Sequence, residues 1–178
     1  MALTGTPSLQ MRLENISTSS RDIIEELLGY LRHDEFDPDP RTCLFPETTT
    51  STSQVINISD HNSQISSYIS SSFYQTIQTI ECAFYGKRVR AHFSLFTPGM
   101  DFLVAKGSDD PMVYRCALGL IIGHPMKNTG VWIEGRGVKH HETGKWIIWR
   151  SNIPHNFFNY SKSDRVILVI DVNMRERL

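Results

Sequence analysis

The spacing of apolar residues divides the chain into a helical first part and a strand-rich second part. Residues 19–36, SSRDIIEELLGYLRHDEF, place leucine and isoleucine at helical intervals behind a serine that can cap the first turn, which predicts a helix. VINIS at 55–59 alternates and predicts a short strand, and a second helix is expected from Asp60 to about Gln78. Residues 1–17 show no such period, so we expect a flexible N-terminus.

From Cys82 onward the apolar period becomes two, which is the period of a β-strand. ECAFYGKRVRAHFSLF predicts a hairpin turning at Gly86, and further strands are expected in VYRCALGLIIG, GVWIEGRG, GKWIIW and RVILVIDV. Short strands without helices between them favour a closed or sandwich-like antiparallel domain. We therefore predict a mainly β domain over 18–178, with two helices in a preface over 18–80 and a jelly-roll core over 82–174.

Composition narrows the classes of partner. Eighteen basic and nineteen acidic residues give the 178-residue chain a formal net charge of −1, without the basic stripe that nucleic-acid binding requires. The sequence has neither an apolar stretch long enough to span a membrane nor a secretion signal at its start, so we expect a cytoplasmic protein. Three cysteines without C-x-x-C spacing indicate reduced thiols rather than a disulfide framework or a zinc site. A homodimer is compatible with the sequence.

Candidate chemistry centres on His155 and Arg165. His155 follows the strand GKWIIW and precedes FFNYS, which predicts a turn position at the mouth of the barrel, where ligands commonly bind; the alternative is a histidine that only makes local hydrogen bonds. Alternation places Arg165 and Asp171 on the same face of one strand. If that face points inward, the Arg165 guanidinium needs an anionic ligand or an internal acid such as Asp171 or Glu134.

Arg115, in VYRCALGL, repeats this situation on an earlier strand. Two arginines on strands that flank one cavity would form a clamp for a carboxylate, whereas the simpler alternative is two exposed strand arginines. His140-His141-Glu142 lies beside a glycine turn, and neighbouring strand residues point to opposite faces, so we expect an exposed loop there rather than a metal cluster.

Four segments together resemble a known family. TPGMDFLVAKG, YRCALGL, ETGKWIIWRSNIPH and RVILVIDV occur in the order of the aspartyl/asparaginyl β-hydroxylases, over about residues 85–174. The resemblance implies a double-stranded β-helix, a cupin-like jelly roll, that holds Fe(II) and 2-oxoglutarate. By the same resemblance His155 matches the distal iron histidine, Arg165 the arginine that binds the co-substrate carboxylate, and Arg115 a second co-substrate residue.

The sequence departs from the family pattern at positions that carry its chemistry. The family's His-x-Gly, whose histidine is the first iron ligand, is Ala105-Lys106-Gly107 here, and Ala117 stands where a co-substrate histidine is usual. Arg150-Ser151-Asn152 replaces an acidic pair before His155. One imidazole does not retain Fe(II), because such sites use two or three ligands with oriented neighbours. A replacement ligand would have to come from Asp101, Asp109, Asp110, His92 or His124.

Three functions remain compatible with these residues. The first is an enzyme without a cofactor that carries out isomerisation, elimination or cyclisation on a small organic molecule with a carboxylate or carbonyl group, by acid/base catalysis. The second is an Fe(II)/2-oxoglutarate hydroxylase with an altered ligand set, in which His155 would hold the metal. The third is a pseudoenzyme that binds a ligand or partner. The expected catalytic residues are His155, Arg165, Arg115 and Lys106, and the expected substrate-binding residues are Trp132, Trp149, Phe157, Tyr160 and Arg150.

Overall fold

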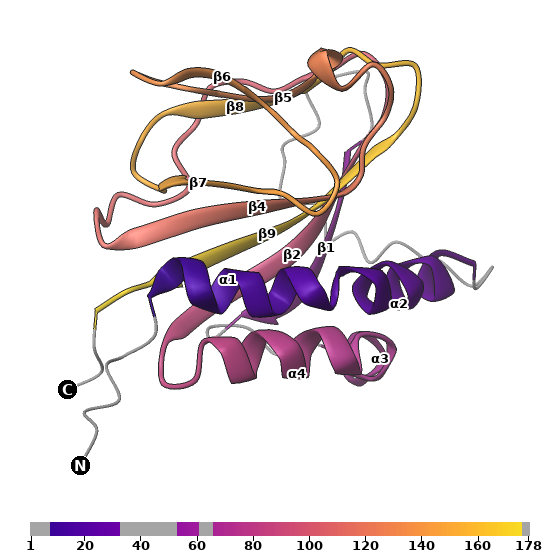
Figure 1. The fold of residues 1–178 in the computed structure, drawn as a ribbon, viewed down its shortest axis with the longest axis vertical. Helices are drawn as coiled ribbons and strands as arrows, with labels where there is room; N and C mark the ends of the chain where they lie inside the picture. The colour runs from indigo at the N-terminus through magenta and orange to yellow at the C-terminus, as the bar shows by residue number, and fades with distance from the viewer. Residues whose placement is uncertain (1–7, 33–52, 61–65, 176–178) are drawn as a thin grey trace.

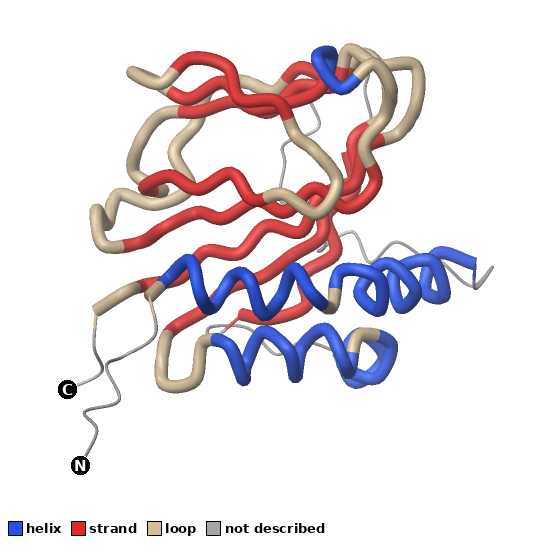
Figure 2. The backbone as a smooth tube through the Cα atoms, in the orientation of Figure 1, coloured by secondary structure: helices blue, strands red, loops and turns tan. Residues whose placement is uncertain are grey.

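A layer of helices lies against a pair of stacked sheets in the computed structural model (Figure 1), which describes residues 8–32, 53–60 and 66–175. The four α-helices of the described residues are α1 (Leu9–Thr18), α2 (Ser20–Arg32), α3 (Ser67–Ser72) and α4 (Tyr74–Ala83). They lie together on the outer side of the larger sheet (Figure 2), so that sheet has one face toward the helices and one toward the smaller sheet.

The strands of the two sheets are interleaved along the chain. The larger sheet has the order β1 (Ser53–Asp60), β2 (Arg88–Phe96), β9 (Arg165–Asn173), β4 (Val113–Ile121) and β7 (Trp146–Arg150). The smaller sheet has the order β3 (Met100–Asp101), β8 (His155–Asn159), β5 (Thr129–Ile133) and β6 (Gly137–His140). All neighbouring strands pair antiparallel. From β2 onward the chain repeatedly crosses between the sheets, and this topology is a double-stranded β-helix, as predicted.

The central strand β9 shows why the predicted alternation matters. Its even-numbered residues from Val166 to Val172 pack in the core beneath the helices, whereas Ile167 and Val169 pack between the two sheets. Arg165 and Asp171 share the second face, so both point into the barrel. The inward orientation that the sequence left conditional is therefore confirmed.

The segment 9–17, expected to be flexible, is instead the helix α1. Ser8 caps it by accepting a hydrogen bond from the backbone N–H of Met11, and Leu13 and Ile16 are fully buried. The indole Nε1 of Trp146 on β7 donates to the Leu13 carbonyl at 3.0 Å and to the Ser17 hydroxyl at 2.6 Å. The prediction failed because the run of apolar residues at helical spacing is short. The stability of this helix depends on its packing against the barrel. Residues 1–7 lie outside the described residues.

Two other boundaries differ from the prediction. The expected second helix is a pair of shorter helices that meet at the buried Phe73, while Asp60 ends β1 and residues 61–65 lie outside the described part. The expected hairpin at Gly86 is a turn from α4 into β2, and β2 pairs with β1 and β9. Gly86 has a φ of 75°, so the predicted turn is present. A glycine at a turn does not show whether a helix or a strand precedes it.

A carboxylate of α2 caps α4 from outside the helix. Glu26 accepts hydrogen bonds from the backbone N–H groups of Gln75 and Thr76, at 2.8 and 2.9 Å, and from the Thr76 hydroxyl at 2.6 Å. The N-cap residue Phe73 provides no side-chain hydrogen bond of its own. Glu26 therefore supplies the capping that the local sequence lacks.

We expect Glu26→Ala to lower the free energy of unfolding by about 1–2 kcal/mol, because the first turn of α4 loses its acceptor. The control is Glu25→Ala, which removes only an exposed pair with Arg21 and should cost less than about 0.5 kcal/mol. Urea denaturation of both variants measures the difference. Equal losses would mean that Glu26 does not act as the cap.

Candidate functional site

A buried ion pair lies inside the barrel, between β4 and β9. Arg115 and Asp171 are direct partners in the strand register, and Arg115 donates from Nε to Oδ1 at 2.7 Å and from Nη2 to Oδ2 at 2.6 Å. Arg90 adds a third bond to Oδ2 at 2.9 Å. Burial alone would raise the pKa of Asp171, but the hydrogen bonds and charges of the two arginines hold it below its ordinary value. The Nε/Nη2 edge of Arg115 is thus already occupied by a carboxylate.

His155 is held by hydrogen bonds at both ring nitrogens. Nδ1 lies 2.8 Å from the Ile153 carbonyl and therefore donates, and Nε2 lies 3.0 Å from Nη1 of Arg115 and accepts, because arginine can only donate. Burial lowers the pKa of His155 to about 4, with the Arg115 charge acting in the same direction and the bond to Ile153 opposing it. The imidazole is consequently neutral near pH 7, with its lone pair directed at Arg115. His155 begins β8 and is 4 % exposed, so the predicted open turn is wrong.

The segment that resembles the family's first iron-ligand motif does lie beside His155. The backbone N–H of Ala105 donates to the His155 carbonyl and that of His155 donates to the Ala105 carbonyl, both at 3.0 Å. This position carries a methyl group. Lys106 is exposed, and its Nζ lies 3.8 Å from Oδ1 of Asp109. It therefore does not reach the pair of Arg115 and Asp171 inside the barrel. The predicted catalytic lysine is therefore not brought together with His155 by the described contacts.

The other possible metal ligands are distributed around the fold. Asp101 accepts from Tyr160 and Asn156, Asp110 accepts from Asn173 and Arg175, and Asp109 and His124 are exposed. Of these candidate ligands only His92, on β2 opposite Val169, points into the barrel. Burial lowers the pKa of His92 to about 4. No group of three or more potential ligands occurs within residues 8–32, 53–60 and 66–175. With both nitrogens of His155 engaged, this donor set does not fit Fe(II).

Arg165 spans the two sheets. Its Nη1 donates to the carbonyls of Gly130 and Phe158, each at 2.9 Å, and its guanidinium carbon lies 3.9 Å from the centre of the Phe96 ring. Nε and Nη2 are buried and have no hydrogen-bond partner among the described residues. Burial lowers the pKa of Arg165 to about 9, which still leaves it charged at neutral pH.

Neither expected internal acid pairs with Arg165. Asp171 binds Arg115 and Arg90, and Glu134 is exposed. Arg115 pairs with Asp171, which is six residues along β9 from Arg165. The Cα atoms of the two arginines are therefore about 20 Å apart along the strands. The predicted clamp of Arg115 and Arg165 around one carboxylate is therefore wrong, because each arginine serves a different part of the barrel.

The Phe157 ring lies between Arg165 and the pair of His155 and Arg115. The centre of the Phe157 ring is 5.8 Å from the His155 ring centre, 5.9 Å from that of Trp149 and 5.7 Å from the guanidinium carbon of Arg165. Trp149 is buried and its Nε1 has no partner among the described residues. Two predicted substrate-binding residues, Trp149 and Phe157, thus do border His155.

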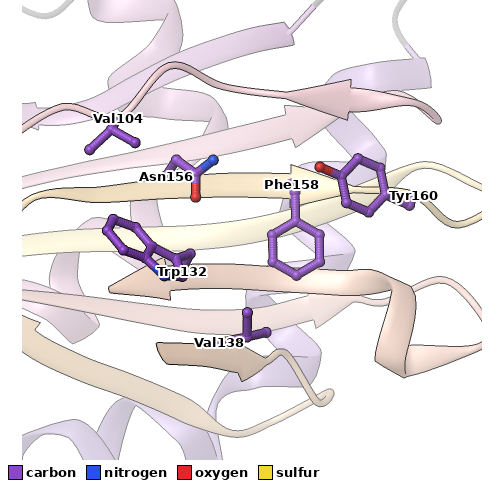
Figure 3. A pocket seen from close by; sticks show the side chains of 6 residues that line it. All are labelled: Val104, Trp132, Val138, Asn156, Phe158 and Tyr160. Carbon is purple, nitrogen blue, oxygen red and sulfur yellow. The ribbon is translucent and has the colours of Figure 1, made fainter. Parts of the chain in front are cut away.

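The remaining predicted substrate-binding residues point elsewhere. Trp132 and Tyr160 line an open hollow of about 340 Å³ on the outer face of the smaller sheet (Figure 3), together with Val104, Val138, Asn156 and Phe158. Arg150 is exposed, with its guanidinium carbon 6.0 Å from the Tyr114 ring centre. Strand alternation separates these side chains from the barrel interior.

His141 was missed by the sequence prediction. It is fully buried, with Nδ1 3.4 Å from Nη1 of Arg165, whereas its neighbour His140 is exposed. The expectation of an exposed loop is wrong for His141. The opposite orientation of adjacent strand residues, which argued against a metal cluster, was also the signal that one of the two histidines points inward.

A model of the Aspartyl/Asparaginyl beta-hydroxylase family matches residues 62–175. The chain belongs to this family. The family and the fold are those of oxygenase-type enzymes, while no curated protein matches the sequence.

Solved structures with a similar course of the chain have low sequence identity. A prolyl-4-hydroxylase from Pseudomonas putida is 16% identical, with 92% of this chain and 88% of that chain covered and a TM-score of 0.49. An RmlC-like cupin family protein with a double-stranded β-helix fold from Methanocaldococcus jannaschii is 11% identical, with 72% and 86% covered and a TM-score of 0.44. No helix in the described part of this chain is long and apolar enough to cross a membrane.

The loop over Arg115 depends on a glycine. A Cβ added to Gly107 would overlap Cζ and Nη2 of Arg115 and the Ser151 hydroxyl. The Arg115 side chain cannot swing aside without leaving Asp171, so the close approach requires glycine.

Gly107→Ala should destabilise the protein by about 1–3 kcal/mol through this overlap. Gly29→Ala is the matched control, because a Cβ there meets nothing within 4 Å and the residue lies in α2. That control should gain about 0.5–1 kcal/mol. Thermal and urea unfolding compare the two variants, and an unchanged Gly107→Ala stability would show that the loop does not pack on Arg115.

Proposed function

We propose that this protein is a metal-independent enzyme that moves a proton on a small carboxylic acid bearing a carbonyl group, leading to isomerisation, elimination or cyclisation. The observation that carries the proposal is the pairing of a neutral His155 with Arg115, while across the Phe157 ring a second buried arginine, Arg165, has two donors without partners among the described residues.

The residues around His155 do not form a binding site for iron. The lone pair on Nε2, which a metal would need, accepts a hydrogen bond from Arg115, and Ala105, which pairs with His155 through its backbone, has no side-chain atom that could bind a metal. A metal ligand must offer a free lone pair, and retention of Fe(II) requires more than one such ligand. We therefore assign the chemistry to the side chains themselves.

Arg165 provides the anchor for the substrate carboxylate. A buried guanidinium without a counter-ion costs several kcal/mol, and a bound carboxylate offsets that cost through two charge-assisted hydrogen bonds. The donors Nε and Nη2 are covered by neighbouring side chains. A ligand reaches them when a covering ring moves, and Phe157, which borders both Arg165 and His155, is the ring that we assign to this movement.

His155 and Arg115 provide the base and the stabilising donor. Nε2 and Nη1 lie 3.0 Å apart, a separation suited to a substrate that presents an acidic C–H group next to a carbonyl oxygen. The carbonyl oxygen takes the N–H of Arg115, which frees Nε2 to accept the proton from carbon. The enolate that forms is stabilised by Arg115, and His155 then returns the proton to a different carbon.

The test measures proton exchange without any cofactor. Wild-type protein is incubated in D₂O with EDTA and pools of carboxylic acids whose carbonyl group lies at increasing distance from the carboxylate, and deuterium uptake is followed by mass spectrometry. We expect uptake by at least one acid, a decrease of about 100-fold or more in His155→Gln, and weaker substrate binding in Arg165→Lys. Arg150→Lys, which changes an exposed residue, is the control and should behave as wild type.

Two results would overturn the proposal. Formation of succinate that depends on Fe(II), 2-oxoglutarate and the protein would support the hydroxylase with an altered ligand set. Saturable binding of an organic acid without exchange, in wild type and variants alike, would support the ligand-binding pseudoenzyme.

A further inference from the structure

The hollow on the outer face of the smaller sheet takes no part in the chemistry assigned to the barrel interior. We propose that this hollow binds a small organic cation, of the quaternary ammonium class, through its aromatic rings and the carboxylate of Asp101. Its volume of about 340 Å³ lies at the lower end of the range for sites that bind small molecules. Because strand alternation places it on the face of β8 opposite to His155, the inference does not depend on the proposed function.

Strand alternation also explains why several rings meet on this face. Asn156, Phe158 and Tyr160 stand at every second position along β8 and just beyond its end. Trp132 on β5 is opposite Asn156 in the register, and Val138 on β6 is opposite Trp132. Side chains from three strands are thereby brought around one space (Figure 3).

The rings that line the hollow differ in their exposure. Phe158 is only 7 % exposed, and its ring stacks on that of Tyr160 with 5.1 Å between centres and 25° between planes. Tyr160 is exposed and Trp132 is half-buried. The hollow therefore presents aromatic surface to solvent over a ring that is fixed in the sheet.

A carboxylate lies beside two of the lining residues. Oδ2 of Asp101 accepts from the Tyr160 hydroxyl at 2.5 Å, and Oδ1 accepts from Nδ2 of Asn156 at 3.0 Å. The bond to Asp101 raises the pKa of Tyr160 to about 12, so the phenol remains a neutral donor. Asp101 thus adds a negative charge at the edge of the aromatic surface.

These groups favour a cation over other ligands. None of the six residues that line the hollow is charged, and the Tyr160 hydroxyl and the Asn156 amide already donate to Asp101. An anion would meet the negative faces of the rings and the carboxylate, and a ligand with many hydroxyl groups would leave them without partners. A quaternary ammonium group needs no hydrogen-bond acceptor, and both the ring faces and the carboxylate attract it.

Choline is the probe, and its binding to the full chain is followed by NMR titration. Dimethylbutanol, the analogue of choline in which a carbon atom replaces the ammonium nitrogen, has the same shape without the charge. We expect saturable binding of choline in the millimolar range and binding of the analogue that is about fivefold weaker or more. Equal binding of the two compounds, or no binding of choline, would overturn the proposal.

Two substitutions test the ring and the carboxylate separately. Trp132→Leu keeps an apolar side chain and should reduce the preference for choline over the analogue to about twofold or less. Asp101→Asn keeps an acceptor for Tyr160 and should weaken choline binding about threefold without changing the binding of the analogue. The control is Asp109→Asn, which removes an exposed carboxylate that pairs with Lys106 and should bind as wild type. A preference for choline that survives both substitutions would contradict the proposal.

If Trp132→Leu does not fold, the indole N–H resonance of Trp132 in the wild-type protein provides the test. A shift of this resonance as choline is added supports the proposal. A resonance that stays unchanged up to saturation places choline elsewhere and contradicts it.

Discussion

The burial of one guanidinium between two sheets is the constraint on which the rest of this barrel depends. Arg165 joins β9 to β5 and β8 through two backbone carbonyls and stacks on Phe96, with no carboxylate beside it in the described chain. Carbonyls satisfy the hydrogen bonds of only one end of the group and do not neutralise its charge. A barrel that keeps such a group suggests a ligand that supplies the missing negative charge.

The two inward arginines show what distinguishes a structural pair from a binding group. Asp171 occupies the Nε/Nη2 edge of Arg115 and Nη1 donates to His155, so Arg115 positions the histidine and that edge cannot also anchor a carboxylate. Arg165 has the same fork, but no acid of the described residues pairs with it. Ala117 is buried between the sheets and Ala105 pairs with His155 through its backbone, so neither position adds an imidazole, and His155 is bound to an arginine.

The sequence predicted those features that depend on local pattern. The alternation of β9 correctly placed Arg165 and Asp171 on one face, and the run of short strands correctly indicated an antiparallel jelly roll. Strand register is not a local property, which is why the pairing of Arg115 with Asp171 could not be predicted from the sequence and why alternation alone favoured a clamp of two arginines. Tertiary packing likewise decided α1, whose apolar residues become an ordered helix only against Trp146 and the larger sheet.

The protonation of the two ring nitrogens of His155 tests most directly whether this histidine is bound to Arg115 or to a metal. A ¹⁵N-detected NMR spectrum of the labelled protein at pH 7 reports the protonation of each ring nitrogen, before and after one equivalent of Fe(II) with 2-oxoglutarate under nitrogen. The account predicts a proton on Nδ1, an unprotonated Nε2 that accepts a hydrogen bond, and no selective broadening of these signals when iron is added. Selective loss of the His155 signals at stoichiometric Fe(II) would show a seated metal and contradict the account.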